Sequence, residues 1–160
     1  MLVRFTKNAP SAKADTLTCI RADGTNTTGS MPKQGVLPHD AIHYVVENTL
    51  GWREAFFGQI EAGDDFAPVS ARFHDQKNAA VRHPRERQSE ALVECLQAEQ
   101  WGGAPHPTAF SEKLTKACHA HRVAALVLTA TDLDRVRVAL REFGAAWRPL
   151  GSGKSLERTF

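Results

Sequence analysis

The 160-residue sequence lacks long apolar runs, paired cysteines and the features of a secretory signal. No stretch approaches the roughly 18 consecutive apolar residues of a transmembrane helix, and the first residues contain no apolar segment of signal-peptide length. The three cysteines, Cys19, Cys95 and Cys118, stand far apart and form no CxxC pair. This pattern is typical of reduced thiols rather than of disulfides. We therefore expect a cytoplasmic protein that does not associate with membranes.

A strong excess of one charge is also absent. Lysine and arginine number 20 against 18 aspartates and glutamates, which gives a net charge of +2 and no strong footprint for nucleic acid. The sequence contains no GxSxG motif and no dinucleotide fingerprint. GSGKS at 151–155 is no phosphate-binding loop, because Arg148 occupies the position where that motif requires its first glycine. We expect no nucleotide cofactor.

The composition is otherwise that of a globular protein, with 42% hydrophobic and 24% charged residues, and this length predicts a single domain over 1–160. Residues 1–31 predict a small antiparallel meander. The segment LVRFT alternates as a half-buried strand does, TLTCIRA at 16–22 is rich in β-branched residues, and Asp23-Gly24 suits a tight turn before a returning strand.

Helical spacing dominates after this meander. Residues 38–63 predict two helices separated near Gly51, and the polar segment 64–87 predicts a loop. Residues 88–148 predict further helices, the last of them capped by Thr131 or Asp132, and 150–160 contains a possible terminal strand. The expected fold class is therefore α+β, with a small antiparallel sheet covered by about four to five helices.

The segment LPHDAIHYVVENTLG at 37–51 holds the main candidate site. His39, His43 and Glu47 follow one another at intervals of four residues, so they climb one flank of the predicted helix in steps of about 40°. Two histidines at this spacing can present both imidazoles to one divalent metal such as zinc. Glu47 or a distal histidine would complete the ligand set, and the distal candidates are His74, His83, His106, His119 and His121.

The string HDAIH is similar to the HExxH motif of zinc peptidases, although Asp40 stands in place of the glutamate that activates water. Two hypotheses follow. In the first, a non-catalytic cytoplasmic domain binds a protein or small-molecule partner through the polar flank from His39 to Glu47. In the second, a small hydrolase-like enzyme uses His39 and His43 as metal ligands, with Asp40 as the base or as the group that orients a ligand.

Two other clusters have weaker functional interpretations. Cys118 lies beside His119 and His121 and could be a nucleophile, but its place on an apolar helical stripe favours a buried, inert thiol. The basic segment 72–87 could bind nucleic acid weakly, together with arginines of the last helix. Since Phe73 is its only aromatic residue, the segment favours a solvated charged surface instead.

LPHDAIHYVVENTLG, followed by AFFGQIEAG, resembles a segment of small uncharacterised bacterial proteins with the general form LPHDxxHxxVExxLG. Trp147 and the terminal GSGKSLERTF match further features of that group, so the resemblance covers about half of the chain. It implies a bacterial protein of similar α+β layout and directs attention to a set of motif residues, but it implies no activity, cofactor or partner. These residues are Pro38, His39, Asp40, His43 and Glu47.

Overall fold

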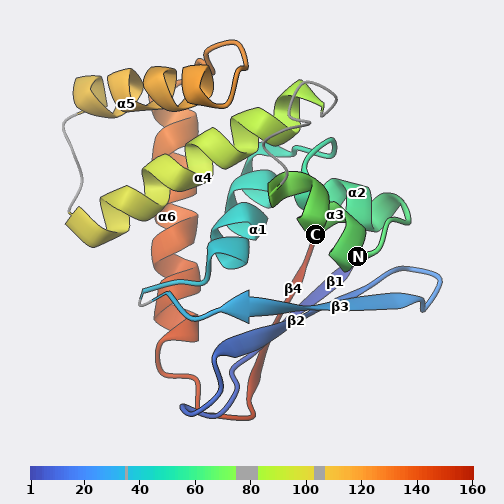
Figure 1. Ribbon diagram of the computed structural model, residues 1–160. Coiled ribbons are helices and arrows are strands. Elements are labelled where there is room, and N and C mark those ends of the chain that lie inside the picture. The colour runs from blue at the N-terminus through green and yellow to red at the C-terminus, as the bar shows by residue number, and fades with distance from the viewer. Residues whose placement is uncertain (35, 75–82, 103–106) are drawn as a thin grey trace.

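The computed structural model describes all residues except 35, 75–82 and 103–106, and the described part contains one four-stranded sheet and six helices (Figure 1). The strands are β1 (Leu2–Thr6), β2 (Ala14–Ile20), β3 (Asn26–Pro32) and β4 (Ser155–Thr159). The helices are α1 (His39–Leu50), α2 (Phe56–Ala62), α3 (Phe66–His74), α4 (Pro84–Gly102), α5 (Pro107–Ala120) and α6 (Ala130–Trp147). The helices gather on one side of the sheet, which confirms the α+β prediction.

All strand pairs in the sheet are antiparallel, and the strand order is β3-β2-β1-β4. Val3 pairs with Cys19 and Phe5 with Leu17, and these four side chains are fully buried. Alternate residues of β1 and β2 are only partly buried, as expected for a sheet with helices on one face. The terminal strand predicted within 150–160 is confirmed, because β4 pairs with β1 over its whole length.

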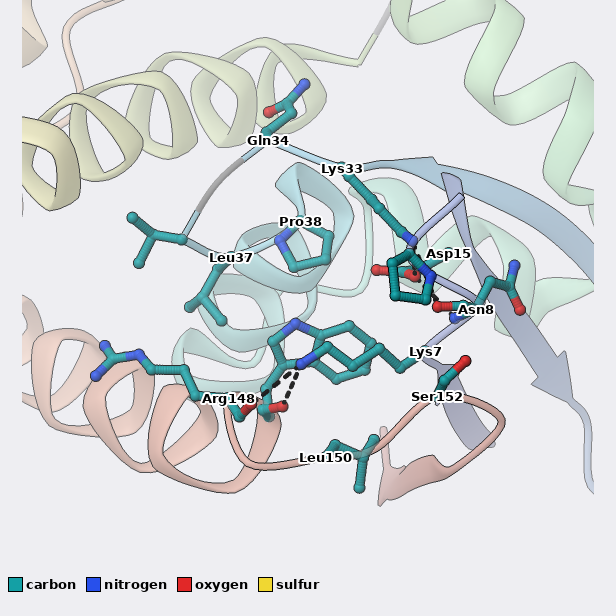
Figure 2. Close-up of a pocket in the computed structure, with 13 residues that line it drawn as sticks. Lys7, Asn8, Asp15, Lys33, Gln34, Leu37, Pro38, Arg148, Leu150 and Ser152 are labelled. Carbon is teal, nitrogen blue, oxygen red and sulfur yellow. Dashed lines mark hydrogen bonds and ion pairs between the residues drawn. The ribbon is translucent and has the colours of Figure 1, made fainter. Parts of the chain in front are cut away.

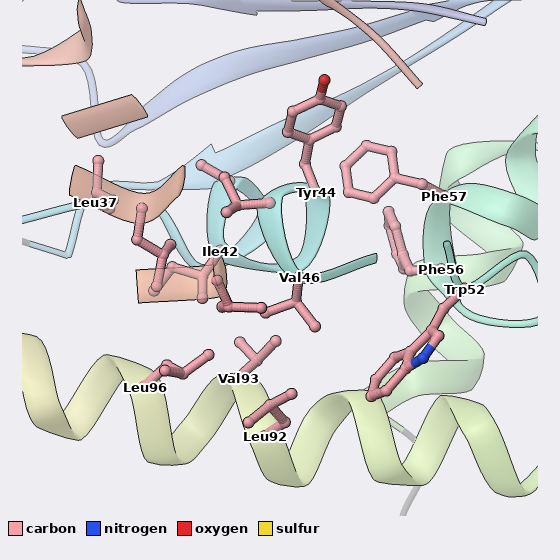
Figure 3. Packing of buried hydrophobic residues seen from close by; sticks show 14 of the residues in the cluster. Leu37, Ile42, Tyr44, Val46, Trp52, Phe56, Phe57, Leu92, Val93 and Leu96 are labelled. Carbon is pink, nitrogen blue, oxygen red and sulfur yellow. The ribbon is translucent and has the colours of Figure 1, made fainter. Parts of the chain in front are cut away.

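Helix α1 lies at the centre of the fold, between the sheet and α4 (Figure 1). It begins after Pro38 and ends at Gly51, whose φ of 68° is the left-handed conformation that favours glycine at a helix end. Figure 3 shows Ile42 and Val46 of α1 facing Leu92, Val93 and Leu96 of α4. These apolar contacts fix α4 against one side of α1, and with it the polar residues that α4 carries on the same face.

The prediction of a loop over 64–87 is wrong at both ends. Phe66, Val69 and Phe73 recur at helical spacing along α3, and all three are buried. At the other end α4 already begins at Pro84, since the first turn of a helix does not need the N–H that proline lacks. Residues 75–82, in the middle of the predicted loop, lie outside the described residues.

Other boundaries differ by smaller amounts. Six helices occur in the described residues where the sequence predicted four to five. The last of them, α6, is capped by Thr129 rather than by Thr131 or Asp132, because the Thr129 hydroxyl accepts a hydrogen bond of 3.0 Å from the Asp132 N–H. Within the described part of the chain, none of the helices has both the length and the apolar character needed to cross a membrane.

Candidate metal centre

The polar residues of α1 and α4 meet at the interface between these two helices. The Nε2 atom of His43 lies 3.3 Å from Oε2 of Glu90, and the Nε2 atom of His39 lies 3.6 Å from the same oxygen. One ligand atom from each of these three residues lies within 4.8 Å of the other two. His39 and His43 come from successive turns of α1, and Glu90 comes from α4, so packing of the two helices builds the group.

His43 is held from its other side by groups that do not belong to this cluster. Its Nδ1 atom lies 3.2 Å from Oε1 of Glu47 and 3.2 Å from the Ser89 hydroxyl. The Ser89 hydroxyl in turn donates a hydrogen bond of 3.1 Å to Oε1 of Glu47. Because Nδ1–H is directed to these acceptors, the Nε2 atom of His43 is the one that faces His39 and Glu90.

Glu47 is fully buried and connects the cluster to α2. Its carboxylate accepts hydrogen bonds from the backbone N–H groups of Phe56, at 3.2 Å, and Phe57, at 2.8 Å. These are the first two residues of α2, whose N-cap Ala55 provides no side-chain acceptor. Glu47 therefore performs the capping role that Ala55 cannot, and these bonds keep its carboxylate in place beside His43.

The charges of the cluster are strongly coupled. Burial alone would lower the pKa of His43, but the neighbouring carboxylates of Glu90 and Glu47 outweigh this effect and raise the pKa to about 10. Burial alone would raise the pKa of Glu90, whereas His43 and, to a smaller extent, His39 lower it to about 2. In the absence of metal, a protonated His43 therefore lies between two carboxylates. A divalent cation bound here would replace the Nε2 proton.

Two of the three separations within the cluster suit a small divalent ion. Zinc bonds to histidine nitrogen and carboxylate oxygen at ~2.0–2.2 Å, so tetrahedral ligands lie about 3.3–3.6 Å from one another. The two separations that involve Glu90, 3.3 and 3.6 Å, match this range. Three protein ligands leave a fourth position for water. The His39 side chain is 22% exposed and that of Glu90 is 11% exposed, so the cluster reaches solvent on their side.

The structure brings together two of the three residues that the sequence predicted as ligands, His39 and His43. Glu47 takes a different place as the hydrogen-bond partner of Nδ1 of His43, and Glu90 is the third member of the group. The sequence carried one signal for Glu90, because polar and apolar residues share one buried face of α4. Polar residues in line with an apolar stripe indicate buried polar side chains, and such side chains need hydrogen-bond or ionic partners. The residues of this face are Glu86, Ser89, Glu90, Val93 and Leu96.

None of the other described histidines belongs to the group. His121 pairs with Glu94 at 3.1 Å, and its charge also helps to lower the pKa of Glu90, after the larger effects of His43 and His39. Both His83 and His119 are exposed. His106 and the side chain of His74 lie outside the described residues. Asp40, the predicted base, is no member of the three-residue group.

The other candidate clusters show features of ordinary structural residues. Cys118 is fully buried, and burial raises the pKa of its thiol, which disfavours the nucleophilic thiolate. In the basic segment, Arg72 pairs with Asp64 at 3.0 Å, Arg85 lies over the Trp52 ring and Arg87 donates to the Arg122 carbonyl. Lys77 and Arg82 lie outside the described residues.

Comparisons with family models, with curated proteins and with solved structures find no match to this chain. The geometry of the site is therefore the basis for its function.

Proposed function

We propose that this protein binds a divalent cation of the zinc class through His39, His43 and Glu90. The observation that carries the proposal is the convergence of three ligand atoms within 4.8 Å of one another, from two helices fixed by apolar packing. A second feature supports it. Glu47 accepts from Nδ1 of His43, and metal-binding histidines are commonly oriented by a carboxylate in this way.

The burial of this flank favours a metal over a docked partner. His43 is 2% exposed and Glu47 is fully buried, because α4 covers both residues. A protein or small molecule that approached the flank from His39 to Glu47 would reach His39 but not the other two side chains. A metal ion, by contrast, fits between the ligand atoms and needs access only from the side of His39.

A hydrolytic activity is a second candidate function, and the number of protein ligands favours it. Two histidines and one glutamate leave a coordination position open, as in zinc sites that lower the pKa of a bound water and use it as a nucleophile. The partial exposure of His39 provides a route for water to that position. We assign no general base, because Asp40 does not belong to the three-residue group.

The test is the metal content of protein purified without a histidine tag, measured by mass spectrometry before and after incubation with zinc. We expect about one equivalent of zinc in the wild type and its loss in His39→Ala and Glu90→Gln. Glu112→Gln is the matched control, because Glu112 is an exposed carboxylate on α5 that does not belong to the three-residue group. A wild-type protein that takes up neither zinc nor cobalt would refute the proposal.

The hydrolytic function needs a separate measurement. Protein reconstituted with zinc should hydrolyse activated esters faster than chelator-treated protein, and Glu90→Gln should behave as the chelator-treated protein does. Zinc binding without any zinc-dependent hydrolysis of esters, phosphate esters or amides would leave the metal site intact and overturn the enzymatic function.

A further inference from the structure

Two adjoining cavities lie at the opposite end of α1 from α2. Neither is lined by His39, His43 or Glu90. The first has a volume of about 540 Å³ and the second of about 250 Å³. Both are lined by Val36, Leu37 and Arg148, so the two cavities together form one elongated trough. Their size is that of cavities that hold small organic molecules.

Two lysines give the first cavity its positive charge (Figure 2). The Lys7 ammonium donates to the carbonyl oxygens of Trp147, at 3.3 Å, and Arg148, at 3.1 Å. The Lys33 ammonium donates to the Ala9 carbonyl at 2.7 Å. Neutral carbonyls hold the Lys7 ammonium in place without cancelling its charge. Asp15, the one carboxylate among the described residues of this lining, lies 3.6 Å from Lys33 and offsets the charge of that lysine.

The second cavity is also positively charged. Arg137 is neutralised there by Glu99, which it contacts through two hydrogen bonds of 2.9 Å. Arg141 and Arg148 have no ion pair with any residue in the described ranges, and both line this cavity. The Nε2 group of Gln100, which also lines it, is buried and has no acceptor among the described residues. Such a donor is expected to have a partner.

The middle of the trough is apolar. Leu37 and Pro38 lie between the two ends, and Leu150 and the Trp147 side chain complete the wall of the first cavity. In Figure 2, Lys33 and Asp15 lie on one side of this wall and Arg148 on the other, with Pro38 between them. Positive groups at separate points along an apolar cavity suit a ligand with two separated negative groups and an apolar body.

We propose that the trough binds an elongated organic dianion of the dicarboxylate class. One carboxylate would lie at the Lys7 ammonium, which only neutral carbonyls hold. The other would lie at Arg148 and Arg141, where the Gln100 amide has a donor to offer. A guanidinium binds a carboxylate through two parallel hydrogen bonds, so the arginine end would contribute most to orientation. This site is independent of the metal cluster.

The test is titration calorimetry with linear dicarboxylates of increasing length, from succinate to azelate, in the presence of a chelator. We expect the affinity to pass through a maximum at one chain length and to exceed that of the monocarboxylate of equal length. Arg148→Ala should weaken the best dicarboxylate roughly tenfold, the effect of losing one charged hydrogen-bonded pair. It should leave the affinity for the monocarboxylate unchanged, because the monocarboxylate would bind at Lys7.

Matched controls separate this site from general charge effects and from the metal cluster. Lys113→Ala removes one exposed positive charge on α5 and should not alter binding, and neither should His39→Ala. Arg148 is itself exposed, so its alanine variant should fold. Absence of binding for every dicarboxylate, or equal binding by wild type and Arg148→Ala, would overturn the proposal without bearing on the metal site.

Discussion

The Oε1 atom of Glu47 lies 3.2 Å from Nδ1 of His43, one helical turn earlier on α1. The same carboxylate accepts the N–H groups of the first two residues of α2. One buried side chain thus orients a candidate metal ligand and caps a neighbouring helix. Both roles require a hydrogen-bond acceptor at position 47.

Glu47→Gln should weaken zinc binding by roughly 10- to 100-fold, the usual effect of removing a carboxylate that orients a ligating histidine. It should also lower the free energy of unfolding by about 1–3 kcal/mol, because the amide NH₂ cannot accept from the backbone of α2. Zinc affinity would be measured by competition with a chromogenic chelator, and stability by urea unfolding. The exposed Glu112→Gln serves as the control, and equal behaviour of the two variants would contradict the role of Glu47.

The stability of the metal-free protein should depend on pH through His43 and Glu90. The pKa of His43 is raised from 6.5 to about 10 in the folded state, so its contribution is full below pH 6.5 and is lost as the pH rises through about 10. The pKa of Glu90 is lowered from 4.5 to about 2, so its contribution is full above pH 4.5 and is lost as the pH falls through about 2. The stabilisation from this pair should therefore be greatest between pH 4.5 and 6.5.

Urea unfolding in the presence of a chelator, carried out from pH 6.5 to pH 10, measures the part of this effect that His43 contributes. The comparison is between wild type and Glu90→Gln, because the variant lacks the carboxylate that stabilises the charged form of His43. The difference in free energy of unfolding between the two proteins should shrink from pH 6.5 toward pH 10. A difference that grows over this interval would show that His43 is not protonated in the metal-free fold.

All three cysteines should resist alkylation in the native protein near neutral pH. Burial raises the pKa of Cys19 to about 12 and that of Cys95 to about 11, and it raises the pKa of Cys118 as well. Reaction with a disulfide reagent should therefore be slow until guanidinium unfolds the chain, when three equivalents should react. Rapid modification of Cys118 in the folded protein would restore the nucleophile hypothesis.

Gly58→Ala should destabilise the protein by about 1–3 kcal/mol, because a methyl group at this position would overlap the backbone carbonyl of Arg53. The control is Gly102→Ala on α4, where a methyl group would meet no atom of the described residues within 4 Å. That change should be neutral or stabilise the helix by up to about 1 kcal/mol. Thermal unfolding of both variants distinguishes the two effects, and a Gly58→Ala variant as stable as wild type would contradict the close packing of α2.

The elements that local sequence patterns specify were the ones predicted well. The alternation of LVRFT and the Asp23-Gly24 turn identified the sheet, and the helical spacing after Pro38 identified α1 almost to the residue. Helix α3 was missed because its apolar stripe is short and is followed by a polar segment, and because it packs against α2 and against β3, a strand distant in the sequence. Its stability comes from tertiary contacts, which local propensity does not report.

Only the part of the candidate site that lies on α1 could be predicted from the sequence. His39 and His43 were found because both belong to the same turn-by-turn pattern on α1. Glu90 lies 47 residues from His43 in the sequence, so no spacing rule connects the two, and only the packing of α4 on α1 brings them together. Glu47 was assigned as a ligand because its spacing is correct, but spacing alone does not reveal that the start of α2 would engage its carboxylate.

The hydrogen bond of 2.8 Å from the Phe57 N–H to Glu47 gives the candidate site an internal reporter. In a nitrogen-15 NMR spectrum, the Phe57 amide should respond to any change of charge at the far side of the His43 ring, although Phe57 itself contacts no metal ligand atom through its backbone. Occupancy could then be followed by titration in solution with a spectroscopically silent ion such as zinc. The amide signal of Phe57 would report occupancy in the wild-type protein, without any substitution at the site.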